Sequence, residues 1–143
     1  RLPEEFNVAY RQVGLPVADE WFLSACFNLE AGDTEQAQKK IKQLLEQRSS
    51  SQPIGLASCG STFRNPKNDY AARLIEQSGL KGKCIGDACV SEKHANFVIN
   101  QGKASAKDIE QLVEKIETTV FEKTGVRLER EFHIIGKATG GSR

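Results

Sequence analysis

The sequence predicts an α+β fold, because helix-like and strand-like segments are both present without the regular alternation of a parallel α/β sheet. Apolar residues recur at helical spacing in two long stretches, while strand-like apolar segments lie elsewhere. The chain has 143 residues, the size of one domain or of one domain with a fragment of another. No internal repeat is visible.

The first thirty residues are expected to hold a loop and one strand. Residues 1–18 contain two prolines and several changes between apolar and polar residues, which predicts a loop with a short extended piece at 6–11. Residues 21–29 are rich in apolar and aromatic side chains. This composition predicts a buried strand.

A helix is expected next, followed by a break in the chain. Asp33 or Thr34 can cap its N-terminus, and the helix should continue to about Arg48. One stripe of apolar side chains lies along it: Ala37, Ile41, Leu44 and Leu45. The polar segment 49–53 ends in proline and should break the helix, so we place a domain boundary after residue 52.

The second half begins with a short helix at 69–77, which Gly79 should cap at its C-terminus. Residues 80–90 are expected to form turns, because they contain several glycines and small residues. A short strand should follow at 95–100.

The last predicted helix starts with a capping box, Ser105-Ala-Lys-Asp108, and stops at Gly125. Its apolar positions have helical spacing: Ile109, Leu112, Val113, Ile116 and Val120. Residues 126–135 alternate as a half-buried strand would, and the glycine-rich tail 137–143 should be frayed.

The composition excludes several classes of protein. It is 38% hydrophobic and 27% charged, which is typical of a soluble domain with a core. The net charge is +1 with no basic cluster, so a nucleic-acid-binding surface is not expected. No apolar run has the length of a membrane helix. The chain begins at Arg1 rather than Met, and we therefore expect it to be part of a longer protein.

The four cysteines are expected to be free thiols in a reducing cytoplasm. Cys26 and Cys59 lie among apolar or small residues, which predicts that they are buried. Cys84, Cys89 and His94 could be taken for zinc ligands, but their spacing fits no common zinc module and a fourth ligand is missing. We expect no metal site.

The segment from Gly60 to Pro66 is the strongest candidate for a functional loop. Its glycine permits unusual backbone angles and its proline excludes helix at the residue before it. It can thus aim the side chains of Ser61, Arg64 and Asn65 into one space. A loop serine can equally serve only to satisfy the backbone.

Two familiar chemistries fit Ser61 poorly. The Gly-x-Ser-x-Gly turn of serine hydrolases is absent, although His94 could be a base for such a nucleophile. A phosphate-binding loop would need more glycines and a Gly-Lys-Ser/Thr sequence. A hydroxyl without a strong base is better suited to hold a proton or to deliver one to a carbanion.

Four further polar residues are considered, each with an ordinary alternative. Glu131 lies within the last predicted strand and could simply face solvent. Arg11 follows Tyr10 near the N-terminus and could be a surface charge. His94 and His133 could belong either to the core or to the surface.

Four motifs occur in the order and spacing of one family: Gly60-Ser-Thr-Phe-Arg-Asn-Pro66, Ala72-Arg-Leu-Ile-Glu-Gln-Ser-Gly-Leu-Lys-Gly82, Val90-Ser-Glu-Lys-His-Ala-Asn-Phe-Val-Ile-Asn100 and Gly125-Val-Arg-Leu-Glu-Arg-Glu-Phe-His-Ile-Ile-Gly136. They resemble the C-terminal, substrate-binding part of UDP-N-acetylenolpyruvoylglucosamine reductase (UDP-N-acetylmuramate dehydrogenase). The resemblance implies a two-layer α+β substrate-binding domain at 53–136, preceded at 1–52 by the end of an FAD-binding domain. No lid insertion lies between Arg11 and Ser61, which resembles the family's shorter, type II form.

The resemblance also implies a reaction. NADPH reduces FAD, and the reduced flavin passes hydride to the enolpyruvyl double bond of UDP-N-acetylglucosamine enolpyruvate. Ser61 would then protonate the enolate, while Arg11 and Glu131 would stabilise its charge. The substrate-binding positions implied by the family are Tyr10, Asn65, Arg64 and His94.

The expected setting follows from the same resemblance. The parent protein would be a cytoplasmic oxidoreductase of peptidoglycan precursor synthesis, needed for cell-wall formation, cell shape and cell division. Both FAD and NADPH would be bound mainly by residues outside this chain, since no Gly-x-Gly-x-x-Gly occurs in it. The chain alone should therefore be inactive. A stand-alone UDP-sugar-binding module without redox activity is the alternative.

Overall fold

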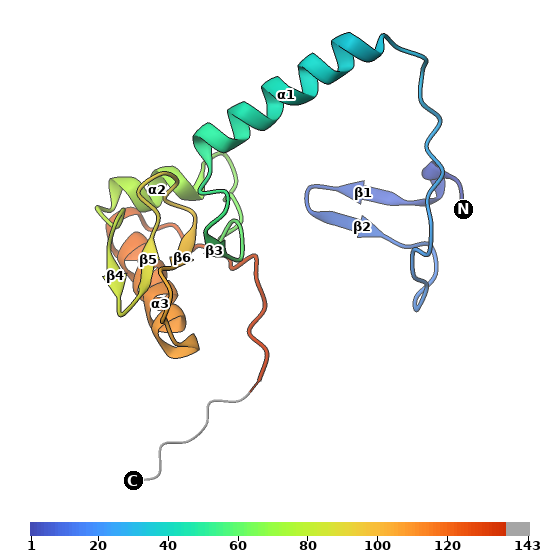
Figure 1. Ribbon diagram of the computed structural model, residues 1–143. Coiled ribbons are helices and arrows are strands. Elements are labelled where there is room, and N and C mark those ends of the chain that lie inside the picture. Colours follow the sequence, from blue (N-terminus) through green and yellow to red (C-terminus); the bar gives the residue numbers. More distant parts are fainter. Residues whose placement is uncertain (137–143) are drawn as a thin grey trace. The chain divides into compact units, whose positions relative to one another are not determined.

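The computed structural model describes residues 1–136, and the predicted tail at 137–143 lies outside them (Figure 1). The chain divides into two compact units, the first covering Arg1–Glu35 and the second starting at Gln36. Helices and strands are both present in the order of an α+β fold, which confirms the predicted class. The predicted boundary after residue 52, which concerns domains of a longer protein, stays a prediction.

A β-hairpin dominates the first unit. It follows a short 3-10 helix, η1 (Pro3–Glu5), and pairs β1 (Asn7–Ala9) with β2 (Gln12–Gly14) in antiparallel register. Tyr10 and Arg11 form the turn between the strands, in the region where the sequence predicted only a short extended piece. Arg11 has a positive φ of 60°, a left-handed conformation that few non-glycine residues adopt.

The predicted buried strand at 21–29 is wrong. This segment has no regular secondary structure, and most of its large apolar side chains are exposed, with 78% exposure for Trp21 and 97% for Leu23. Phe22 contacts the ring of Phe6 at a centroid distance of 5.3 Å. An apolar run forms a strand only beside a second strand, and no strand pairs with this segment within residues 1–136.

Helix α1 (Thr34–Ser51) confirms the predicted helix but extends past its predicted end. The hydroxyls of Ser50 and Ser51 donate to the carbonyl oxygen of Gln47 at 2.8 and 3.0 Å. Serine can thus satisfy its hydroxyl within a helix, which explains why the run of serines did not end it. The apolar stripe of α1 is exposed within the described chain.

The second unit contains a four-stranded antiparallel sheet in the order β3-β6-β5-β4. Its strands are short: β3 (Ala57–Ser58), β4 (Cys84–Ile85), β5 (Ala88–Val90) and β6 (Val98–Asn100). The predicted strand at 95–100 is therefore present in its second half. The turns expected at 80–90 include a hairpin, β4–β5, which the sequence did not predict.

Two helices form the second layer (Figure 1). Helix α3 (Ala106–Thr124) packs against β4, β5 and β6, and α2 (Ala71–Gln77) packs against α3. The predicted capping box of α3 is present, and the helix ends at Gly125 with a φ of 71°. The largest fully buried side chains of the core include Phe63, Ile75, Leu112 and Ile116.

The predicted strand at 126–135 is wrong as well. The segment makes one antiparallel bridge, between Phe63 and Arg130. Its partner is the loop that contains Ser61, and on one side of the bridge Pro66 has no N–H with which the loop could continue the pairing.

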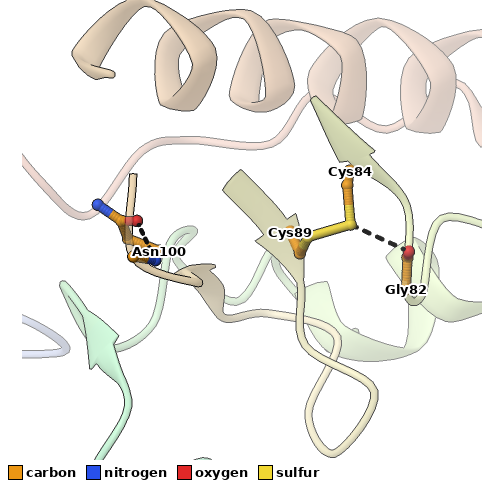
Figure 2. Close-up of a disulfide and its surroundings, with 5 residues drawn as sticks. Gly82, Cys84, Cys89 and Asn100 are labelled. Carbon is orange, nitrogen blue, oxygen red and sulfur yellow. Dashed lines mark hydrogen bonds between the residues drawn. A yellow bond between two sulfur atoms is a disulfide. The ribbon is translucent and has the colours of Figure 1, made fainter. Parts of the chain in front are cut away.

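Two of the four cysteines form a disulfide, which corrects the expectation of free thiols. Cys84 in β4 faces Cys89 in β5, and the bond crosslinks the two strands (Figure 2). Cys84 Sγ also lies 3.5 Å from the carbonyl oxygen of Gly82. Cys26 and Cys59 are free, but both are exposed and not buried as predicted. Strand pairing brings Cys84 and Cys89 together, and the β4–β5 hairpin that does so was not predicted.

Candidate functional site

The loop that contains Ser61 is anchored on one side by Asn96. The N–H of Thr62 donates to the carbonyl oxygen of Asn96 at 2.8 Å. The side chain of Asn96 accepts from the N–H of Phe63 at 2.9 Å and donates to the carbonyl oxygen of Phe63 at 2.8 Å. The hydroxyl of Thr62 accepts from the N–H of Val98 at 3.2 Å. The backbone next to Ser61 is therefore fixed by buried hydrogen bonds.

The opposite side of the loop is held by the segment after α3. The N–H of Glu131 donates to the carbonyl oxygen of Thr62 at 2.9 Å, and the N–H of Arg64 donates to that of Glu129 at 2.8 Å. Glu131 is half-buried, and its Oε2 atom is shielded from solvent. The structure thus places Ser61 and Glu131 on neighbouring, hydrogen-bonded segments, although the sequence separates them by seventy positions.

A salt bridge fixes the segment around Glu131. Arg130 Nε donates to Glu117 Oε1 at 2.6 Å and Arg130 Nη2 donates to Glu117 Oε2 at 2.7 Å. The pair is partly buried, and it raises the pKa of Arg130. Since Glu117 lies on α3, the bridge ties residues 129–131 to a helix of the core.

Cys59 lies at the start of the Ser61 loop. The pKa of its thiol is raised, mainly by desolvation and to a smaller extent by Glu131. Cys59 also lines a small, mostly apolar cavity of about 230 Å³, together with Thr62, Val98, Ile109, Val113 and Phe132.

Arg64 and Asn65 are partly occupied by structural contacts. Arg64 Nη1 lies 2.9 Å from Glu129 Oε1, in a pair whose side chains are both substantially exposed. Asn65 Oδ1 accepts from the N–H of Ala71 at 3.1 Å, the first residue of α2. Asn65 thus satisfies a backbone donor that the start of a helix leaves open. Its side-chain NH₂ group is the part available for a ligand.

His94 is half-buried and is oriented by its neighbours. Its Nδ1 accepts from the N–H of Asn96 at 3.3 Å, and its ring contacts Phe97 edge-on at a centroid distance of 4.9 Å. Burial lowers the pKa of the imidazole. A neutral imidazole whose Nδ1 accepts a hydrogen bond carries its proton on Nε2. His94 is thus arranged to donate a hydrogen bond and not to act as a base for Ser61.

Tyr10 and Arg11 belong to the first unit, on the turn of the β1–β2 hairpin. The guanidinium carbon of Arg11 lies 5.8 Å from the centre of the Tyr10 ring, a cation–π contact. Both side chains are exposed. Their proposed roles beside Ser61 stay predictions.

The sequence missed two residues of the site, Asn96 and Glu117. Asn96 stands between apolar neighbours in a segment predicted as a strand, and a polar residue at such a position is the signal that could have identified it. Glu117 is one of several acidic residues on α3, and nothing in its local sequence distinguishes it.

Within the described part of the chain, no cluster of three or more His, Cys, Asp or Glu side chains could hold a metal ion. No helix of residues 1–136 is both long enough and apolar enough to cross a bilayer.

Comparison with known proteins identifies close relatives. A family model, UDP-N-acetylenolpyruvoylglucosamine reductase, C-terminal domain, matches residues 52–135. UDP-N-acetylenolpyruvoylglucosamine reductase of Alkalilimnicola ehrlichii is 54% identical over 138 residues, which are 96% of this chain and 46% of the relative. The enzyme of the same name from Legionella pneumophila strain Corby is 54% identical over 144 residues, covering 100% of this chain and 46% of the relative.

A crystal structure shows the same similarity in three dimensions. UDP-N-acetylenolpyruvylglucosamine reductase from Thermus caldophilus superposes with a TM-score of 0.65 at 30% identity. The match covers 92% of this chain and 47% of the other. The chain thus spans about half the length of the curated relatives it matches.

Proposed function

The chain belongs to the UDP-N-acetylenolpyruvoylglucosamine reductase family, and we propose that it is the substrate-binding part of such a reductase. The complete enzyme would reduce UDP-N-acetylglucosamine enolpyruvate to UDP-N-acetylmuramate with NADPH and FAD. The proposal includes a cytoplasmic location and a role in peptidoglycan precursor synthesis, and through it in cell-wall formation and division.

We propose that FAD and NADPH are held mainly by residues outside this chain. The glycines of the described residues do not form a Gly-x-Gly-x-x-Gly turn at the start of a helix, the arrangement suited to a dinucleotide pyrophosphate. When bound, the flavin would supply the hydride that the enolpyruvyl double bond receives.

One observation carries the assignment of roles: the Ser61 loop and the Glu131 segment are hydrogen-bonded to each other and joined by the Phe63–Arg130 bridge. A hydroxyl and a carboxyl group on adjacent segments can act on one small substrate group. Hydride addition to the double bond leaves an enolate, and Ser61 would deliver a proton to the α-carbon of that enolate. Glu131 would stabilise the enolate only in its protonated or hydrogen-bonded form, since two bare carboxylates repel.

The remaining candidates would position the substrate. Arg11 would bind its carboxylate and offset the charge that develops during the reaction. The free side-chain donors of Asn65 and the Nε2–H of His94 can hydrogen-bond a nucleotide sugar, while Arg64 and Tyr10 would line the same site. These roles rest on the match of each residue to a family motif.

The test uses the full-length reductase that contains this chain. Ser61→Ala should leave the reduction of flavin by NADPH unchanged and slow flavin reoxidation by the enolpyruvyl substrate by about 100-fold or more, since general acid catalysis contributes 10²–10⁴-fold. Ser50→Ala is the matched control, because Ser50 is exposed on α1 and its hydroxyl bonds only to Gln47. Reoxidation at the control rate in Ser61→Ala would remove Ser61 from proton delivery.

The same experiment separates the other two functions. If the substrate binds but never reoxidises the wild-type flavin, the protein is a UDP-sugar-binding module and not a reductase. Labelling of Ser61 by an organophosphate would instead indicate a hydrolase, which the Nδ1 hydrogen bond of His94 argues against.

A further inference from the structure

We propose that Asn96 is a positioning residue, whose side-chain amide holds Ser61 in the direction needed for proton transfer. This inference rests on the proposed function, because it concerns the aim of the Ser61 hydroxyl. The side-chain amide of Asn96 bonds to the backbone of Phe63, so it would act on Ser61 through the loop.

The side-chain amide of Asn96 hydrogen-bonds to the backbone of Phe63 in the way that the backbone of a neighbouring strand would. It accepts from the N–H of Phe63 at 2.9 Å and donates to the carbonyl oxygen of the same residue at 2.8 Å. The backbone carbonyl of Asn96 adds a third bond, from the N–H of Thr62 at 2.8 Å. Three hydrogen bonds from one residue thus fix two consecutive residues that directly follow Ser61.

These bonds are made in the core, where they are hard to replace. Asn96 is 4% exposed, and Thr62 and Phe63 are 1% exposed each. Water cannot readily take over a bond at such a site, so removal of the amide would leave the N–H and C=O of Phe63 without partners. The loop would then have to move to satisfy them.

Ser61 is sensitive to such a movement because its other neighbour is a glycine. Gly60 has a φ of 84°, and nothing lies within 4 Å of the place where its Cβ would be. The chain before Ser61 is therefore open and permissive, so the bonds after Ser61 fix its orientation. A misplacement of about 1 Å can slow an enzymatic step by about 10².

An isosteric substitution separates the two functions of the amide. Asn96→Asp keeps the acceptor for the N–H of Phe63 but, when ionised, lacks the donor for its carbonyl oxygen. When protonated, the carboxyl group presents one acceptor and one O–H donor, as the amide does. Burial raises the pKa of a carboxyl group, so this rescue should occur at mildly acidic pH.

The experiment measures both half-reactions in the full-length reductase between pH 5.5 and 8. In Asn96→Asp, flavin reduction by NADPH should stay within twofold of wild type. Reoxidation by the enolpyruvyl substrate should fall about 100-fold at pH 8, in kcat more than in KM. The ratio of the variant rate to the wild-type rate should then rise at least tenfold by pH 5.5. Asn68→Asp, on the exposed turn before α2, should show a ratio near one at every pH.

Asn96→Leu completes the set, because it has no titrating group and its ratio should be low and independent of pH. Amide hydrogen exchange gives a readout without catalysis: in Asn96→Leu, which lacks the side-chain acceptor, the N–H of Phe63 should lose protection relative to wild type at every pH. A flat ratio in Asn96→Asp, or unchanged protection of the Phe63 N–H in Asn96→Leu, would overturn the positioning role. Failure of the wild-type flavin to be reoxidised would overturn the proposed function instead.

Discussion

Glu117→Gln should destabilise the chain by removing one charge from the pair that holds the segment around Glu131. The substitution keeps the size of the side chain and one carbonyl oxygen. It replaces two charge-assisted hydrogen bonds of 2.6 and 2.7 Å by at most one neutral acceptor and leaves the guanidinium of Arg130 without its carboxylate.

The size of the effect follows from how far the pair is exposed. The side chains of Arg130 and Glu117 are 29% and 27% exposed, between a surface pair and a buried one. Surface pairs contribute about 0–1 kcal/mol, and hydrogen bonds to charged groups about 1.5–3 kcal/mol. We therefore expect a loss of about 1–2 kcal/mol in the free energy of unfolding.

Urea denaturation followed by far-ultraviolet circular dichroism measures this loss. With a slope of about 1–3 kcal/mol per M, the midpoint should fall by about 0.3–2 M. Glu122→Gln is the control on the same helix, because Glu122 is exposed and takes no part in the charges that raise the pKa of Arg130. Equal midpoints for the two variants would show that the bridge does not stabilise this segment.

Three further predictions concern other parts of the second unit. Reduction of the Cys84–Cys89 disulfide should lower the free energy of unfolding by about 2 kcal/mol, since the loop that it closes is short. Urea denaturation curves with and without reductant measure this loss. A variant with serine at both positions should not respond to reductant, and a response would contradict the prediction. Ser105→Ala should lower the free energy of unfolding by about 1 kcal/mol, because Ser105 Oγ caps the N-terminus of α3. Thermal denaturation measures this, and an unchanged melting temperature would mean that the cap does not stabilise the chain. Burial lowers the pKa of His94, so the folded state resists protonation of the imidazole. The stability that depends on a neutral His94 is complete above the usual pKa of about 6.5 and is lost as pH falls through the folded pKa. His94→Gln should therefore make the melting temperature depend less on pH between 7.5 and 5.5, and an equal pH dependence in variant and wild type would refute this.

The sequence was sufficient where structure is set by local interactions. The capping box at Ser105, the apolar spacing of α3 and the glycine that ends it are all contained within the helix and its flanks, and all were predicted correctly. The length of α1 was underestimated because serine side chains can bond within a helix, which composition alone does not reveal.

The errors concern elements that depend on a partner elsewhere in the chain. The segments at 21–29 and 126–135 have the composition of strands, but the first has no pairing partner in the described residues and the second meets a short loop. The hairpin of β4 and β5 was missed although Gly86-Asp87, between two apolar pairs, is a known two-residue turn signal.

The candidate site was identified through family motifs and not through local patterns. Those motifs select Ser61 and Glu131, but the pairing that makes them neighbours runs through Thr62 and through the side chain of Asn96. A side chain that pairs with the backbone of a loop does not recur at helix or strand spacing, so the role of Asn96 becomes visible only in the structure.

The left-handed backbone of Arg11 has a consequence for attempts to make the protein more stable. A non-glycine residue in this conformation costs about 1 kcal/mol, and glycine would avoid that cost. Arg11→Gly should therefore strengthen the β1–β2 hairpin while deleting the guanidinium that we assign to the substrate carboxylate. A selection for thermal stability alone would favour this change, so it would produce a more stable protein that lacks the guanidinium needed for the proposed reaction.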